Sequence, residues 1–114
     1  MAALNKLDLI GNLTRDPELR YTPGGMAVVS CGIAVNRKWR NAAGEAQEET
    51  TFVDLTAFAR TAEAMSEFCK KGASVYIGGR LHLDEWEDKT TGEKRRKLVV
   101  VAENVQFLDR REGK

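Results

Sequence analysis

Alternation of apolar and polar residues with a period of two is the feature that most restricts how this chain can fold. Between residues 52 and 60, one parity is apolar throughout: Val53, Leu55, Ala57 and Ala59. The other parity mixes rings with polar side chains: Phe52, Asp54, Thr56, Phe58 and Arg60. Successive side chains of a strand point to opposite faces of its sheet, so a half-buried strand is predicted. Two phenylalanines are then left on its polar face.

The same reasoning predicts four further strands, which cover residues 4–13, 26–36, 75–86 and 98–108. The segments 37–50 and 87–97 are polar and contain glycine, and they lie between predicted strands. They are therefore expected to be hairpin loops, the first of them long and mobile. A short segment from Glu18 to Thr22 is bracketed by turn residues, so the chain is expected to turn on both sides of it.

One helix is predicted between the third and fourth strands, over residues 62–71. Thr61 can cap its N-terminus, and Glu63 suits its first turn. Lys70 suits the last turn, together with Lys71, and Gly72 follows just beyond.

Several apolar residues outside the strands' alternation are expected in the core. Met65, Phe68 and Cys69 recur at helical spacing, and Phe107 lies in the last strand. Cys69 and Cys31 show no CxxC spacing and have no histidine partners, so buried reduced thiols are predicted rather than a disulfide. Reduced thiols indicate a cytoplasmic protein.

Five strands in hairpin-type connections, with a helix between the third and fourth, predict an all-β OB-fold, a small Greek-key barrel. A β-sandwich is the alternative. The 114 residues suffice for one domain, which is expected over residues 1–110 and is followed by a polar end at 111–114 that frays. No basic region precedes an apolar run, and no 18 apolar residues run together, so neither a signal peptide nor a membrane span is expected.

The ionisable residues argue against catalysis. Net charge is +1, from 18 basic and 17 acidic side chains, so any anion site must be local. His82 is the only histidine, and no GxxxxGK motif occurs, so the chain offers no triad, no metal-ligand set and no phosphate loop. A non-enzymatic protein without metal or cofactor is predicted.

Four aromatic residues are interleaved with cations and kept off the predicted core: Trp39, Phe52, Phe58 and Trp86. Exposed rings in this number indicate a surface that a partner covers. Unpaired bases stack on such rings, while nearby Arg and Lys neutralise phosphates. The candidate phosphate contacts are Arg37, Lys38, Arg40, Arg60, Arg80, Lys94, Arg95, Arg96 and Lys97. A second protein would cover the same rings, and RNA is an alternative to DNA.

Longer blocks of the sequence point to one family. They are NKLDLIGNLTRDPELRYTPGG, VNRKW, TTFVDLTAFARTAEAMSEFCKKGASVYIGGRL and the strand that holds Trp86. In these blocks, in their order and spacing, the chain resembles the bacterial single-stranded DNA-binding protein. The resemblance implies an OB-fold that assembles, usually as a homotetramer, and wraps single-stranded DNA with little sequence preference during replication, recombination and repair. It also implies base stacking at the four rings named above and phosphate contacts at Arg20 and Arg60.

The chain departs from the pattern of the family at several positions. Phe52 stands where many members have Trp, a change that keeps a ring. Asp54 stands where many have a base-contacting Arg, and His82, Asp84 and Glu85 occupy a stretch that is often basic. Fewer cations displace fewer counterions, so weaker or more salt-sensitive binding is expected.

Family members normally continue into a flexible linker and an acidic tip that recruits replication and repair proteins, whereas this chain stops at Lys114. Partner recruitment by such a tail is therefore not assigned to these residues. Candidate positions for the interface between subunits are Leu4, Lys6, Val53 and Tyr76. The alternative function is that of an OB-fold interaction module, similar to the dimeric primosomal replication proteins.

Overall fold

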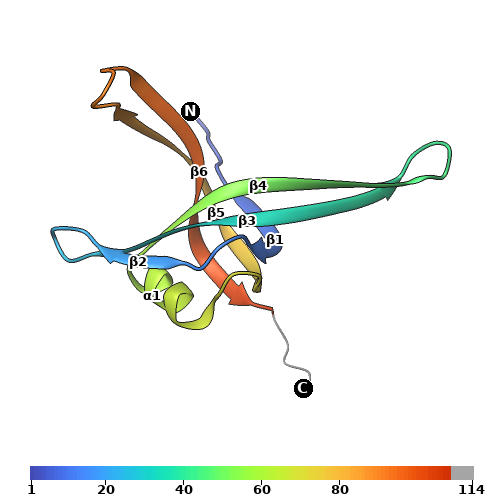
Figure 1. Cartoon of the computed structure of the whole chain (residues 1–114), viewed down its shortest axis with the longest axis horizontal. Helices are drawn as coiled ribbons and strands as arrows, with labels where there is room; N and C mark the ends of the chain where they lie inside the picture. Colours follow the sequence, from blue (N-terminus) through green and yellow to red (C-terminus); the bar gives the residue numbers. More distant parts are fainter. Residues whose placement is uncertain (109–114) are drawn as a thin grey trace.

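The strands of this protein form one sheet that closes on itself, as the computed structural model of residues 1–108 shows (Figure 1). The strands and the single helix are β1 (Leu7–Leu13), β2 (Glu18–Tyr21), β3 (Ala27–Arg40), β4 (Ala46–Phe58), α1 (Ala59–Phe68), β5 (Ser74–Glu87) and β6 (Lys94–Phe107). Their order is β1-β5-β6-β4-β3-β2, and a further β1–β3 pairing closes a five-stranded barrel. The predicted OB-fold is confirmed. The structure has one more strand than predicted, because the segment expected between two turns forms the four-residue strand β2. The strand before the helix, predicted as the third, is therefore β4.

The apolar parity of the strands fills the barrel. Val29, Cys31 and Ile33 of β3 are fully buried, and Leu55 of β4 is 1% exposed. These residues face the barrel interior because β3 and β4 pair with Cys31 opposite Leu55, which places their inward side chains on the same rungs. The core predicted from alternation is confirmed in these strands. Cys69 is buried as well, so both cysteines are buried thiols as expected.

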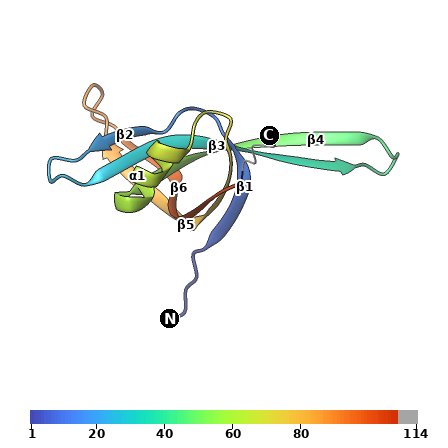
Figure 2. The ribbon, with the colours of Figure 1, turned by 90° about the horizontal axis from the view of Figure 1, so that it is seen from below.

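Two long hairpins leave the barrel as two-stranded ribbons. The β3–β4 pairing continues to Arg40 opposite Ala46, and the β5–β6 pairing continues to Glu87 opposite Lys94. Figure 1 and Figure 2 show the two ribbons pointing away from the barrel in different directions. We call them the β3–β4 ribbon and the β5–β6 ribbon.

The ribbons overturn the prediction of long loops at 37–50 and 87–97, since only residues 41–45 and 88–93 lie outside strands. Both faces of a ribbon are wet beyond the barrel, so its sequence loses the alternation that marks a strand. Oppositely charged residues lie across from each other instead: Arg37 forms an ion pair of 3.5 Å with Glu49, and Lys38 lies opposite Glu48. The β3–β4 turn is closed by Asn41, whose Oδ1 accepts hydrogen bonds from the backbone N–H groups of Ala43 and Glu45.

The helix begins one turn earlier than predicted. Ala59 follows β4 directly with a φ of 56°, a left-handed conformation that is uncommon for a residue with a Cβ. Thr61 therefore lies inside the helix, and the N-cap residue Phe58 makes no side-chain capping hydrogen bond. The first turn holds no acidic residue and the last turn no basic one, so the predicted charge complement of the helix is wrong. The buried side chains of α1 are Ala62 and Met65.

Two phenylalanines expected in the core are exposed instead. Phe68 is 62% exposed and Phe107 is 44% exposed, and their ring centroids lie 5.5 Å apart. Phe68 ends the helix, and Phe107 pairs with Val75 at the last rung of β5 and β6. Both residues therefore lie at the margin of the barrel, where each ring covers part of the other.

The N-terminal segment protects an open edge of the sheet. β1 pairs with β5 only as far as Gly79, which leaves the same edge of β5 open beyond that residue. There the Asn5 side chain accepts a hydrogen bond from the backbone N–H of Leu81 and donates one to its carbonyl oxygen, at 2.9 and 2.8 Å. At the other end of the chain, the predicted frayed segment 111–114 lies outside the described residues. Across residues 1–108, no helix is long and apolar enough to cross a membrane.

Candidate functional site

Strand pairing places three of the four predicted stacking rings on one surface. Phe52 and Phe58 lie on the polar parity of β4, and Trp86 lies on the matching parity of β5. We call this surface, formed by the side chains of β3, β4, β5 and β6 that point away from the core, the outer face. The rings on it are accessible, because Phe52 is 72% exposed, Phe58 39% and Trp86 47%.

A shallow hollow of about 200 Å³ joins β4 to β5 and β6 on the outer face. It is lined by Thr56, Phe58, Arg80, His82, Asp84, Val99 and Val101. Thr56 pairs with Val101 in the parallel β4–β6 contact, and Val101 pairs with Arg80, so one rung crosses three strands. Phe58 and Arg80 therefore line one depression, although 22 residues separate them in sequence.

Trp39 lies on the opposite side of the sheet from the other rings. Its parity in β3 is that of Ile33 and Cys31, the core residues, but at Trp39 the strand has already left the barrel. The indole is 37% exposed, and the Arg37 guanidinium carbon lies 4.4 Å from its ring centroid. Trp39 was expected in a loop and is found in a strand, held against a cation.

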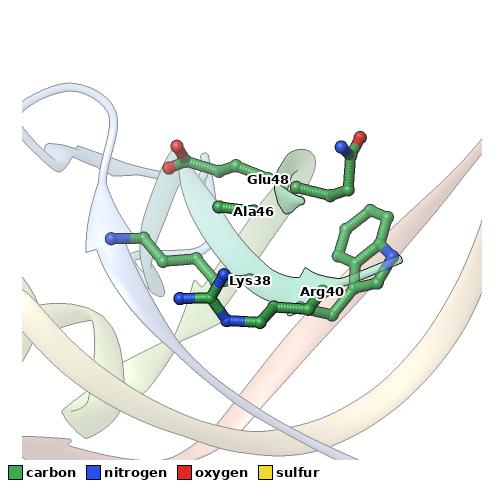
Figure 3. Close-up of a pocket in the computed structure, with 6 residues that line it drawn as sticks. Lys38, Arg40, Ala46 and Glu48 are labelled. Atoms are coloured by element: carbon green, nitrogen blue, oxygen red, sulfur yellow. The ribbon is translucent and has the colours of Figure 1, made fainter. Parts of the chain in front are cut away.

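The tip of the β3–β4 ribbon carries two cations on the outer parity, Lys38 and Arg40 (Figure 3). Figure 3 shows their side chains extending in the same direction, with Ala46 and Glu48 on the neighbouring strand. Arg40 donates a hydrogen bond of 2.8 Å to the Gly44 carbonyl oxygen. The hollow at this tip measures about 460 Å³, and Trp39 is one of the residues that line it. Within residues 1–108, neither Lys38 nor Arg40 makes an ion pair.

The tip of the β5–β6 ribbon is more nearly neutral. Trp86 lies opposite Arg95, and a hollow of about 530 Å³ surrounds them. Arg95 lies 3.4 Å from a carboxylate oxygen of Asp88 and 3.5 Å from one of Glu93. Both acids belong to the turn that joins the two strands, so the charge of Arg95 is compensated within the hairpin.

The other predicted cations are dispersed rather than gathered in one row. Arg20 of β2 is on the outer parity and on the same rung as Phe58, with Val28 of β3 between them. Lys94 and Arg96 lie on the parity opposite Trp86. Arg60 was predicted on the polar face of the strand, and this position is wrong, since the residue lies in the first turn of α1. The structure thus brings Arg20, Lys38, Arg40, Arg80, Arg95 and Lys97 to the outer parity and leaves Arg37, Arg60, Lys94 and Arg96 elsewhere.

Ion pairs neutralise several outer-face cations. Arg80 Nε lies 3.0 Å from a Glu103 carboxylate oxygen, and Lys97 Nζ lies 2.9 Å from Asp54 Oδ2. Both pairs are about half exposed, so solvent weakens their mutual attraction. Asp54 therefore affects the site directly, because it neutralises a cation of the outer face.

Arg15 is a cation of the outer face that the sequence reasoning missed. Its Nη2 lies 3.9 Å from Asp54 Oδ1, over Gly32 of β3. Arg15 is located between β1 and β2, in a stretch where alternation gives no information about direction. Its placement follows from a backbone hydrogen bond of 2.9 Å, in which the Thr14 N–H donates to the Gly32 carbonyl oxygen.

Three of the subunit-interface candidates, Leu4, Lys6 and Tyr76, line one hollow of about 400 Å³. Val53 has the inner parity of β4 and packs against the core instead. Leu4 is 90% exposed, and Tyr76 lies on the outward side of β5 over Gly78. The Tyr76 hydroxyl donates a hydrogen bond of 2.6 Å to Asp8, and this bond raises the pKa of the tyrosine. The interface stays a prediction. No group of three or more metal-ligating side chains occurs in the described part of the chain, residues 1–108.

Known proteins resemble this chain in both sequence and fold. The model of the single-strand binding protein family matches residues 4–108. The single-stranded DNA-binding proteins of Wolinella succinogenes and Helicobacter hepaticus are 49% and 44% identical over 92% of this chain. The chain spans only 64% and 61% of the length of these two relatives.

Two solved structures share the fold. The single-stranded DNA-binding protein of Thermus aquaticus, as a deletion mutant, superimposes with a TM-score of 0.80 at 33% identity, covering 93% of this chain and 51% of that one. The Plasmodium falciparum SSB in complex with ssDNA gives a TM-score of 0.83 at 24% identity, covering 96% of this chain and 98% of that one.

Proposed function

The chain belongs to the single-strand binding protein family, and from this premise we propose that it binds single-stranded DNA with little sequence preference. Its role would be to protect the strand during replication, recombination and repair. One observation carries the proposal for these residues: Phe52, Phe58 and Trp86 are exposed together on the outer face, where β-strand pairing fixes their spacing.

The proposed mechanism divides the work between rings and cations. Each ring offers a flat apolar surface to a base, and stacking contributes about 1 to 3 kcal/mol per base whatever the sequence. Lys38 and Arg40 at the β3–β4 tip, and Arg20 on the rung of Phe58, then meet the phosphates. A site built in this way holds any unpaired strand and rejects a duplex, because paired bases hide their faces.

Trp39 extends the path beyond the outer face. Since it lies on the other side of the β3–β4 ribbon, a strand that reaches both Phe52 and Trp39 has to cross the edge or tip of that ribbon. The cations at the tip, Lys38 and Arg40, lie along this route. In this proposal the DNA therefore bends around the β3–β4 ribbon.

The proposal includes no catalytic step and no cofactor, since stacking and charge neutralisation are sufficient for binding. We further propose a homotetramer, with Leu4, Lys6 and Tyr76 at contacts between subunits, and a cytoplasmic, nucleoid-associated location. Mass measurement of the protein alone and with oligo-dT determines the number of subunits and strands. A monomer that binds DNA would overturn the tetramer and leave the binding site intact.

Titration with oligo-dT at low salt tests the proposed function. The emission of Trp39 and Trp86 should be quenched, and Trp86→Ala should weaken binding by about 1 to 3 kcal/mol. Phe68→Ala is the matched control, because Phe68 is a ring at the end of α1, away from the outer face, and is 62% exposed against 47% for Trp86. Emission that does not change across the titration, or equal losses for the two variants, would contradict the proposal.

A further inference from the structure

Asp54 is placed where a carboxylate opposes the proposed function. It lies on the outer face of β4, two residues from Phe52 and four from Phe58, between two rings that would hold bases. A DNA strand stacked on both rings has to carry its phosphates past this anion. The side chain is 41% exposed, so its charge is accessible to the strand.

The two oxygens of Asp54 are engaged by cations from different parts of the fold. Lys97 of β6 approaches Oδ2 at 2.9 Å, and Arg15 approaches Oδ1 at 3.9 Å. Both cations are about half exposed, so each can turn toward solvent or toward a phosphate without a large rearrangement. Exposed ion pairs are weak and screened by salt, which makes this arrangement easy to exchange.

Arg15 reaches Asp54 because Gly32 leaves space for it. Gly32 pairs with Asp54 across β3 and β4, and a Cβ on Gly32 would lie 2.6 Å from Thr14 Oγ1 and 3.2 Å from Arg15 Nη1. A larger residue would force the Thr14 and Arg15 side chains to shift. The absence of a side chain at this position therefore leaves room for a cation on the outer face.

We propose that Asp54 is an internal counterion, which holds Arg15 and Lys97 in the free protein and is displaced from them by DNA phosphates. The inference rests on the proposed function and adds Arg15 to the DNA contacts. In the free protein the carboxylate lowers the positive potential of the outer face. On binding, Arg15 and Lys97 each exchange the Asp54 carboxylate for a DNA phosphate. Fewer salt ions are therefore released than the number of cations at the site suggests.

The test compares wild type with Asp54→Asn by titrating each with oligo-dT over a range of salt concentrations. The amide keeps the shape of the side chain and removes its charge. Binding by the variant should be about threefold to tenfold tighter near 0.2 M salt, and log K should fall more steeply with log salt, by about 0.7 for each released cation. A purely structural role of Asp54 would instead weaken binding and lower the melting temperature.

Two further variants test whether the change in salt dependence comes from the cations that Asp54 holds. Arg15→Gln in the Asp54→Asn background should reverse about half of the gain in slope, since it removes one of the two released cations. Glu67→Gln is the matched control: it makes the same charge change on an exposed residue of α1 and should leave the slope unchanged. Unchanged or weaker binding by Asp54→Asn at an unchanged melting temperature would overturn the counterion inference. Failure of the wild type to bind oligo-dT would instead overturn the proposed function.

Discussion

Leu55 and Phe52 lie three residues apart in β4, yet Leu55 is 1% exposed and Phe52 is 72% exposed. The difference follows from the pleat, which turns Leu55 to the barrel interior and Phe52 to the outer face. Both side chains are apolar, so hydrophobicity alone does not separate them. The inner residue is packed within the chain, whereas the outer residue is left exposed and, in the proposed function, is covered by a base of the DNA. A substitution on each face should therefore be detected by a different measurement.

The largest effect is expected from Leu55→Ala on the inner face. The truncation leaves a cavity among fully packed neighbours and should lower the free energy of unfolding by about 2 to 5 kcal/mol. The urea midpoint, with an unchanged m-value, measures this loss. Thr56→Ala, its neighbour on the outer face, should cost less than about 1 kcal/mol. Similar costs for the two variants would contradict the division between the faces.

The inner face should also make the protein sensitive to alkali through Cys31. Burial, opposed by the charge of Arg15 and reinforced by Cys69, raises the pKa of the Cys31 thiol from 9.0 to about 11. Below pH 9 the thiol is neutral in both folded and unfolded chains, so it has no effect on stability there. Between pH 9 and 11 only the unfolded chain ionises, which should remove about 2 to 3 kcal/mol from the free energy of unfolding. In Cys31→Ala this part of the alkaline loss should disappear from the urea midpoints.

On the outer face, Phe52→Ala should separate binding from stability. Loss of one stacking surface should weaken oligo-dT binding by about 1 to 3 kcal/mol. Since the ring is largely exposed already, the urea midpoint should change by less than about 0.5 kcal/mol. Phe52→Trp serves as the control, because it keeps a ring and should retain binding. A large loss of stability in Phe52→Ala would mean that the ring packs within the protein.

The smallest effect is expected from Arg37→Gln. This variant tests the part of β3 that lies beyond the barrel, where side chains with the parity of the core residues are exposed. Arg37 stacks on Trp39 and lies 3.5 Å from a Glu49 carboxylate oxygen, all beyond the barrel. Loss of an exposed cation–π contact should cost about 0.5 to 1 kcal/mol and change the emission of Trp39 in the free protein. Lys38→Gln, on the other parity, should leave that emission unchanged. No spectral difference between the two variants would mean that Arg37 does not hold the indole.

Alternation was sufficient to predict the barrel and much of the outer face. The burial of Leu55 and the exposure of Phe52, Phe58 and Trp86 depend only on the pleat and on one wet surface, and both can be read from sequence. Three ribbon segments were missed, the end of β3 and the starts of β4 and β6, because neither face of a ribbon is buried; the β5 strand was predicted nearly to its end. In Arg37 to Arg40 the strand continues with polar residues on both parities, a pattern that a loop also shows.

The remaining errors concern properties that a linear pattern does not contain. The helix starts early because Ala59 adopts a left-handed conformation, and no residue preference indicates this for alanine. The ion pairs of Asp54 join residues 39 and 43 positions apart, and only the closed sheet brings them together. Likewise, the sequence did not show that Arg80, Arg95 and Lys97 are paired with acids.

The contact between Asn5 and Leu81 has a consequence for self-association. An uncovered strand edge offers its N–H and C=O groups to any other extended chain, and this is how sheets of separate molecules join into aggregates. One carboxamide occupies both groups of Leu81, at the point where β1 no longer shields β5. A foreign strand would have to displace Asn5 before it could pair with Leu81, so the amide blocks sheet extension between molecules at this point of the edge.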